Sequence, residues 1–304
     1  MSDNIRMSHD RRRTLIIKIG ALGDVLRTTP ILRQLNGEIW WLTASESIPL
    51  IPKANVFKAV PIEESHHLHG LTFDTILSLD DDYEAALIAS KIPCRRLVGA
   101  YLDNGSITYT PDSNAWFDMS LISRQGKEVA DQQKLENKRS WQEMLFEMWG
   151  GAFRGEEYII EPYPSIEKTF DFGIEVRAGK RWPTKVWNQY PALAVALLND
   201  GYSVQVLEQK HTIGEYIDHI SSCRHLVSGD SLAMHIALGL RIPTVALFTC
   251  TSPTEIYGYG RMEKVISSQL HVAFYKQEYV SAAVNSICLA DVHKACRRIV
   301  DLPG

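Results

Sequence analysis

Residues 14–35 read TLIIKIGALGDVLRTTPILRQL, an apolar run followed by two glycines, an aspartate and an amphipathic segment. The apolar run predicts a strand at 14–19, and the spacing of the later apolar residues predicts a helix at 25–35. Glycine-rich turns between a strand and a helix usually bind phosphate groups, so an acid in this turn is unexpected. Two roles are open for Asp24: an N-cap of the helix, or a carboxylate that accepts a proton as a general base.

The same alternation of short apolar runs and helical patterns continues through both halves of the chain. In the first half, further strands are predicted at 38–43, 56–61, 75–79 and 96–100, and a further helix at 83–91. In the second half, the predicted strands are 170–176, 203–207, 225–227 and 244–248, and the helices are 191–198, 213–220, 231–240 and 289–300. Strands that are apolar throughout suit a parallel sheet covered on both faces, so the sequence predicts a doubly wound α/β fold.

The length of the chain predicts two domains. A chain of 304 residues exceeds the size at which a single core keeps growing. Residues 103–165 interrupt the α/β pattern with a hairpin or irregular stretch, a solvated polar run at 127–138, an amphipathic helix from Ser140 to a glycine stop at Gly150, and a linker at 156–167. We therefore expect an N-terminal Rossmann-like domain at 1–165 and a C-terminal one at 166–304, facing each other across a ligand-binding cleft.

Composition excludes several classes of protein. The formal net charge of −4 gives no electrostatic reason to expect nucleic acid as a partner, because such proteins normally carry a basic excess. The basic cluster at residues 11–13 precedes an apolar run that is too short for a signal peptide, and no run is long enough to span a membrane. We expect a cytoplasmic protein whose arginines allow at most peripheral contact with a membrane. The five cysteines form no C-x-x-C pair and are expected to be reduced structural thiols.

A second candidate site lies at 228–248, SGDSLAMHIALGLRIPTVALF. A predicted strand ends before Asp230, and the next helix starts with small residues, so its first N–H groups are accessible to a diphosphate. His235 follows on the second turn. The structural alternatives are an N-cap for Asp230 and a buried histidine for His235.

A third candidate lies at 179–187, GKRWPTKVW, directly after the first strand of the second domain. Lys180, Arg181 and Lys185 bring positive charge to a loop that is expected to face the cleft, which suits a ligand that carries phosphate. The alternative is a solvated basic loop.

Two rival chemistries are disfavoured. An NAD site needs G-x-G-x-x-G, whereas this chain has Gly20, Gly23 and then Asp24, whose charge would repel phosphates. The triplet Asp80-Asp81-Asp82 contains the Asp-x-Asp of metal-dependent glycosyltransferases, but it also suits the N-terminus of the predicted helix that follows. We predict no metal site.

Three motifs in order, KIGALGDVLRTTPILRQL, GKRWPTKVWNQY and VSGDSLAMHIALGLRIPTVALFTCTSP, together with NKRSWQEML before the linker, resemble the ADP-heptose:lipopolysaccharide heptosyltransferase family of inverting glycosyltransferases. The resemblance covers most of the chain. It implies the GT-B fold, with two Rossmann-like domains of which the first binds the acceptor and the second binds the nucleotide-sugar.

The resemblance also implies roles for individual residues. Asp24 matches the general base. The residues that match donor-binding positions are Lys180, at the diphosphate, Glu208, at the nucleoside, and the D-[ST]-x-x-x-H segment with Asp230, Ser231, Leu232, Ala233 and His235. The chain departs from the family at Leu232, because many members have Gly directly after the Asp-Ser or Asp-Thr pair.

The expected function is transfer of a sugar, namely heptose from ADP-heptose, to a hydroxyl of an acceptor by a metal-independent inverting glycosyltransferase. No cofactor besides the ADP-sugar donor is expected. The acceptor is open: lipopolysaccharide core, another glycan, a protein or a small molecule. Arg27 and Arg139 are candidates for binding it. The alternatives are a non-catalytic nucleotide-sugar-binding protein and an NAD-type oxidoreductase.

Overall fold

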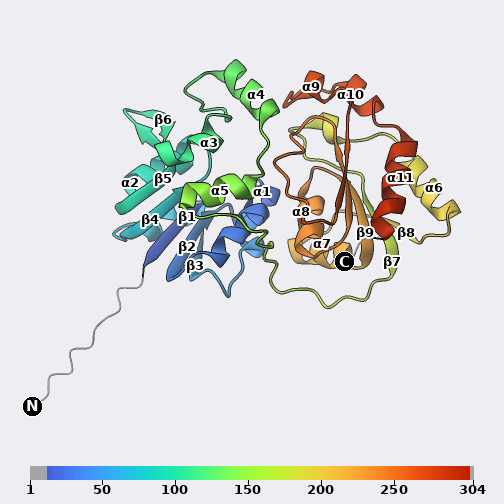
Figure 1. Ribbon diagram of the computed structural model, residues 1–304. Coiled ribbons are helices and arrows are strands. Elements are labelled where there is room, and N and C mark those ends of the chain that lie inside the picture. Colours follow the sequence, from blue (N-terminus) through green and yellow to red (C-terminus); the bar gives the residue numbers. More distant parts are fainter. Residues whose placement is uncertain (1–11, 302–304) are drawn as a thin grey trace, which may run out of the picture.

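The computed structural model describes residues 12–301, and its strands form two separate sheets, one in each half of the chain (Figure 1). The first sheet has the order β3-β2-β1-β4-β5-β6, with all pairs parallel except β5 and β6. Its strands are β1 (Arg13–Ile17), β2 (Glu38–Thr43), β3 (Lys58–Pro61), β4 (Phe73–Ser78), β5 (Cys94–Asp103) and β6 (Ser106–Tyr109). This is the Rossmann strand order with an antiparallel edge strand added.

The second sheet has the order β11-β10-β9-β7-β8 and is parallel throughout. Its strands are β7 (Phe170–Glu175), β8 (Val204–Val206), β9 (Cys223–Gly229), β10 (Thr244–Phe248) and β11 (Met262–Ile266). Counted from β7, the order is that of the other common doubly wound sheet. The predicted fold class, two doubly wound α/β domains, is confirmed. The apolar pattern does not predict β11, a half-exposed edge strand whose two charged residues, Glu263 and Lys264, interrupt any apolar run.

The helices that connect the strands lie close to their predicted positions. They are α1 (Leu22–Thr28), α2 (Tyr83–Lys91), α6 (Tyr190–Asn199), α7 (Ile213–Ser221) and α8 (Leu232–Gly239), and the predicted α11 (Leu289–Val300) follows the last strand. The short helices α3 (Asn114–Phe117), α9 (Leu270–Ala273) and α10 (Ser281–Asn285) were not predicted. The helix predicted at 25–35 is shorter, because α1 gives way at Thr29–Arg33 to a 3₁₀ helix containing Pro30, which has no N–H to donate. Within the described residues, no helix is long and apolar enough to cross a bilayer.

The middle stretch contains two helices. The first, α4 (Lys127–Glu136), corresponds to the predicted polar run, and only Ala130 in it is buried. The second, α5 (Trp141–Trp149), is capped as predicted: Glu143 N donates to Ser140 Oγ at 3.2 Å, and Gly150 adopts the left-handed conformation at φ 97°.

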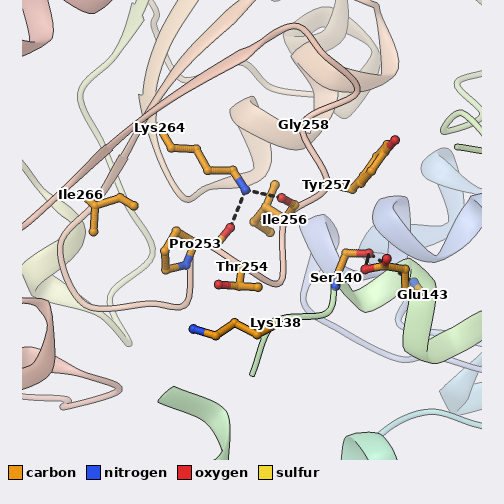
Figure 2. Close-up of a pocket in the computed structure, with 10 residues that line it drawn as sticks. All are labelled: Lys138, Ser140, Glu143, Pro253, Thr254, Ile256, Tyr257, Gly258, Lys264 and Ile266. Atoms are coloured by element: carbon orange, nitrogen blue, oxygen red, sulfur yellow. Dashed lines mark hydrogen bonds between the residues drawn. The ribbon is translucent and has the colours of Figure 1, made fainter. Parts of the chain in front are cut away.

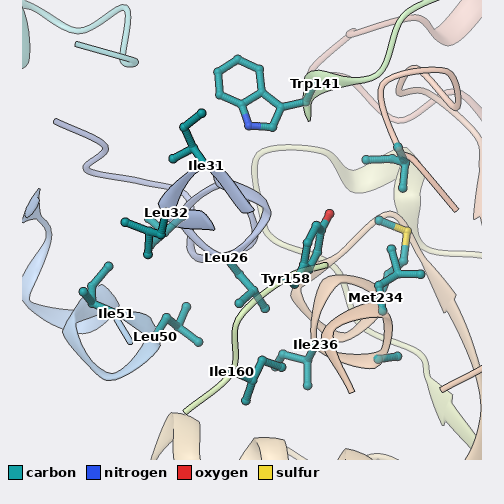
Figure 3. Close-up of a cluster of buried hydrophobic side chains, with 14 of the residues drawn as sticks. Leu26, Ile31, Leu32, Leu50, Ile51, Trp141, Tyr158, Ile160, Met234 and Ile236 are labelled. Carbon is teal, nitrogen blue, oxygen red and sulfur yellow. The ribbon is translucent and has the colours of Figure 1, made fainter. Parts of the chain in front are cut away.

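The predicted linker packs between the two domains. Tyr158 and Ile160 are buried between the apolar side chains of α1 and α8 (Figure 3). Gly239 of α8 makes this possible, since a Cβ there would lie 2.6 Å from Cδ1 of Ile160. One hydrophobic cluster therefore runs from Leu26 in the first domain to Met234 in the second. The predicted boundary at residue 165 lies between α5 and β7 and stays a prediction.

Candidate functional site

Helices α1 and α8 bring the two main sequence motifs together. Each helix follows an inner strand of its sheet, β1 or β9, and the two helices pack against each other across the domain interface (Figure 1). Gly23 allows their close approach, because a Cβ at this residue would lie 2.7 Å from Cδ2 of His235. The carboxyl ends of both parallel sheets thus contribute to one site, as expected of doubly wound folds.

Asp24 is the third residue of α1 and is not its N-cap, which is Ala21. The N-cap alternative is therefore wrong, although Ala21 N still donates to Asp24 Oδ2 at 3.4 Å. The side chain is 35% exposed and forms an ion pair with Arg27, whose Nη2 lies 2.9 Å from Asp24 Oδ1. Burial alone would raise the pKa of Asp24, but the charges of Arg27 and Lys18 outweigh it and hold the pKa below its ordinary value. Asp24 is therefore an ionised carboxylate that solvent can reach.

Arg27 is a buried cation rather than a surface arginine. Its guanidinium lies beside the rings of Trp116 and Trp141, which contact each other, at 5.8 and 5.3 Å from their centroids. Besides Asp24, its partner is Glu255, at 3.8 Å between Nη1 and Oε2. Burial opposes the charge, yet the two carboxylates raise the pKa of Arg27 above its ordinary value. The predicted contact of Arg27 with the acceptor stays a prediction.

Two residues of the acidic triplet, Asp80 and Asp82, accept hydrogen bonds from other parts of the protein. Asp80 accepts hydrogen bonds from Lys18 Nζ and from the backbone N–H of Ile19, and Asp82 is the N-cap of α2, accepting from Ala85 N at 2.8 Å. Among residues 12–301, no group of three or more His, Cys, Asp or Glu side chains is placed to hold a metal ion. Lys18 was not among the predicted site residues, although a lysine inside an apolar run is a signal of a buried, paired charge.

Asp230 is paired with Lys185 on the opposite side of the site. Lys185 Nζ donates to Asp230 Oδ2 and to the Asp230 carbonyl, both at 2.8 Å, and each side chain is 14% exposed. Burial would raise the pKa of Asp230, but the charge and hydrogen bond of Lys185 bring it well below its ordinary value. The N-cap of α8 is Ser231, so the N-cap alternative for Asp230 is wrong.

His235 links the two helices through a chain of hydrogen bonds. Its Nδ1 lies 3.2 Å from Tyr158 Oη, and its Nε2 lies 3.9 Å from Asp230 Oδ1. Gln142 Nε2 donates both to Tyr158 Oη, at 3.2 Å, and to the carbonyl of Arg27, at 3.1 Å. Tyr158 Oη thus forms hydrogen bonds both with Gln142 of α5 and with His235 of α8. Burial lowers the pKa of His235 to about 4, so the ring is neutral at pH 7.

The N-terminus of α8 is regular despite the departure at Leu232. Leu232 is the first helical residue, half-buried, and no positive φ is found there. Ser231 Oγ lies 2.8 Å from Ser228 Oγ, and Ala233 is buried. The first N–H groups of a helix have no intrahelical partner, so this end suits an anion without a glycine.

Three predicted residues lie away from this buried network. Lys180 is exposed in a turn and has no ion pair within residues 12–301. Glu208 follows β8, is 76% exposed and pairs with Lys210 at 3.5 Å. Arg139 is 42% exposed and pairs with Glu147. Their predicted roles stay predictions, and the lysine of the basic loop that is mostly covered, with 14% of its side chain exposed, is Lys185.

A cavity of about 430 Å³ lies beside the site, between the two domains (Figure 2). None of the predicted site residues lines it. Its walls come from the start of α5 and from the loop and strand that follow β10: Lys138, Ser140, Glu143, Pro253, Thr254, Ile256, Tyr257, Gly258, Lys264 and Ile266. Lys264 Nζ donates to the carbonyls of Pro253 and Ile256, both at 2.6 Å, and so holds this loop.

Comparison with known proteins supports the resemblance. The family model described as glycosyltransferase family 9 (heptosyltransferase) matches residues 207–281, a range that contains Glu208, Asp230 and His235. This match confirms the resemblance that the sequence motifs indicated. No curated protein matches the sequence.

Solved structures of similar fold cover nearly the whole chain. A glycosyl transferase family 9 protein from Veillonella parvula has a TM-score of 0.67 at 17% identity, over 95% of this chain and 97% of that chain. ADP-heptose lps heptosyltransferase II of E. coli has a TM-score of 0.61 at 16% identity, over 95% and 98%. E. coli heptosyltransferase WaaC, solved with ADP-2-deoxy-2-fluoro heptose, has a TM-score of 0.58 at 14% identity, over 90% and 98%. The fold is that of family 9 glycosyltransferases.

Proposed function

We propose that this protein is an inverting glycosyltransferase that transfers heptose from ADP-heptose to a hydroxyl of an acceptor. The observation that carries the proposal is the ionised, solvent-accessible Asp24 carboxylate at the start of α1, packed across the domain interface from Asp230, Lys185 and the N-terminus of α8. A base on one domain and an anion-binding helix end on the other are the two elements that inverting transfer requires.

The proposed reaction begins at Asp24. Its carboxylate accepts the proton of the acceptor hydroxyl while that oxygen attacks the anomeric carbon and the bond from this carbon to the diphosphate breaks. The low pKa of Asp24 keeps it ready to accept a proton at neutral pH, and it also makes it a weak base, so its contribution depends on orientation.

The leaving diphosphate would be stabilised by the second domain. The N–H groups at the start of α8, around Ser231, Leu232 and Ala233, and the ammonium group of Lys180 supply positive potential without a metal ion. Lys185 is held by Asp230, so its role is to fix the loop that carries Lys180. Glu208 is assigned to the donor nucleoside.

The acceptor would enter from the N-terminal domain. Arg27 and Arg139 are the residues that we assign to it, and a lipopolysaccharide core, another glycan, a protein or a small molecule would each supply a hydroxyl. Transfer in the cytoplasm is the setting that we expect.

The test compares Asp24→Asn with the parent and with the control Asp81→Asn, which alters a neighbouring acid outside the site. Product formation from ADP-heptose and a panel of other nucleotide-sugars is followed by mass spectrometry, with and without EDTA. Loss of a general base typically costs about 10²- to 10⁴-fold in rate. We expect such a loss for Asp24→Asn only, and no effect of EDTA.

Other outcomes identify other functions. Full activity of Asp24→Asn would remove Asp24 as the base, and loss of activity in EDTA would implicate a metal. Binding of ADP-heptose without turnover of any acceptor would indicate a nucleotide-sugar-binding protein, and a change in nicotinamide absorbance would indicate an oxidoreductase.

A further inference from the structure

Glu255 is a buried carboxylate whose cationic partners come from the other domain. It lies in the loop after β10, and its side chain is 4% exposed. Arg27 Nη1 lies 3.8 Å from its Oε2, and Lys134 Nζ of α4 lies 3.5 Å from its Oε1. Its remaining partner, Tyr275 of its own domain, donates from Oη at 3.4 Å. A carboxylate buried in this way is stable only with its cations present, so it depends on the docking of the two domains.

The position of Glu255 is set by the backbone as well as by charge. Trp141 N, in the first turn of α5, donates to the carbonyl of Glu255 at 3.0 Å, and the indole of Trp141 lies against the guanidinium of Arg27. Trp116 covers Arg27 and also contacts the ammonium of Lys134, at 5.1 Å from its ring centroid. Aromatic rings therefore cover one side of the guanidinium, and Arg27 Nε is buried with no hydrogen-bond partner within the described residues.

Arg27 thus stands between two carboxylates, Asp24 at 2.9 Å and Glu255 at 3.8 Å. In a water-poor environment each carboxylate affects the other through the shared cation. The cation stabilises the charged form of Asp24, and Glu255 offsets part of that effect.

We propose that Glu255 is a positioning residue for Asp24: from the opposite domain it holds Arg27 and reduces the pull of that cation on the Asp24 carboxylate. The inference rests on the proposed role of Asp24 as the base. Docking of the domains then raises the proton affinity of Asp24, because separation would leave Asp24 as the sole carboxylate beside Arg27 and make it a weaker proton acceptor.

The charged groups around Asp24 predict opposite effects on its proton affinity when Arg27 or Glu255 is replaced. Asp24 is surrounded by Lys18 directly after β1, Arg27 from its own helix, His235 from α8 and Asp230 before α8. Arg27 additionally has Tyr158 near it, and Glu255 has Lys134 and Tyr275. Removing the cation of Arg27 raises the proton affinity of Asp24, whereas removing the charge of Glu255 lowers it. A purely structural role would give losses without this opposition in sign.

The experiment is a ¹³C NMR titration of the Asp24 carboxyl carbon in protein labelled at aspartate, assigned by its absence in Asp24→Asn. Arg27→Met is expected to raise the titration midpoint by about 1 pH unit or more, since loss of an adjacent cation typically has that effect. Glu255→Gln, which keeps shape and removes charge, is expected to lower it by a smaller amount. The controls Arg95→Met and Glu147→Gln, at exposed ion pairs, should leave it unchanged.

Two further readouts complete the test. Circular dichroism melts show whether each variant is folded, and Arg27→Lys, which keeps the charge, should restore the midpoint toward the parent value. In transfer assays, Glu255→Gln should lower kcat with little change in KM for the donor. Shifts of the same sign in Arg27→Met and Glu255→Gln, or no shift in Glu255→Gln, would overturn the proposal. The titration needs no turnover, so it stands apart from a failure of the transferase function.

Discussion

Replacing Gly23 with Ala tests whether close packing of α1 on α8 holds the domains together. The added Cβ would lie 2.7 Å from Cδ2, 3.3 Å from Nε2 and 3.6 Å from Cγ of His235. The ring has little room to retreat, because its side chain is 5% exposed and its Nδ1 lies 3.2 Å from Tyr158 Oη. Either the imidazole or one of the helices must move.

The expected cost follows from two opposing effects. Overpacking of a filled interior typically costs about 1–3 kcal/mol. Alanine gains up to about 1 kcal/mol over glycine inside a helix, and less in the first turn, where residue 23 lies. We expect a net loss of about 1–2 kcal/mol in the free energy of unfolding, which for a chain of this size lowers Tm by roughly 2–4 °C.

Urea denaturation and thermal melts measure the change, with Gly20→Ala as the matched control. A Cβ at Gly20 meets no atom within 4 Å, so this variant should stay within about 0.5 kcal/mol of the parent. Combining Gly23→Ala with His235→Ala should recover part of the loss, because the obstructing ring is gone. Equal stability of Gly23→Ala and Gly20→Ala would refute the reasoning.

The other predictions concern the buried charges. Lys185→Met leaves the Asp230 carboxylate buried without its cation and should cost about 3–5 kcal/mol in urea unfolding at pH 7. Because the folded-state pKa of Asp230 is lowered, the ion pair stabilises above the ordinary Asp pKa of about 4 and the difference should shrink below it; an equal cost at pH 3 would contradict this. His235 has a folded-state pKa of about 4 against an ordinary 6.5, so stability should be full above pH 6.5 and fall toward pH 4, by at most about 1.4 kcal/mol per pH unit. His235→Gln should flatten this part of the stability profile measured by urea unfolding, and an unchanged profile would exclude His235 as its source.

Local features were predictable because they depend on neighbours in the sequence. The cap at Ser140 and the stop at Gly150 follow from the requirements of helix ends, and α5 forms between them. The strand, turn and helix around Asp24 follow from the apolar pattern, while the role of Asp24 stays a prediction. The structural alternatives for the two acids were wrong, because Ala21 and Ser231, not Asp24 and Asp230, are the N-caps of α1 and α8.

Partners of buried charges were not predictable in this way. Lys18 and Asp80 are 62 residues apart in the sequence, and Lys185 and Asp230 are 45 apart. The positive charges of Lys180 and Lys185 predicted one basic loop, and only the path of the chain around η5 (Pro183–Lys185) leaves Lys180 exposed and Lys185 mostly covered.

The sequence by itself determined the doubly wound α/β class, the order of the motifs, and Asp24 and Asp230 as acids after inner strands, since periodicity and turn chemistry act over a few residues. Only the tertiary structure decided that Gly23 packs on His235, that Tyr158 joins the two helices, and that Glu255 reaches Arg27. These contacts arise where the domains dock. Burial there makes an unpaired charge costly, so each buried charge takes its partner from whichever element the docking brings within reach.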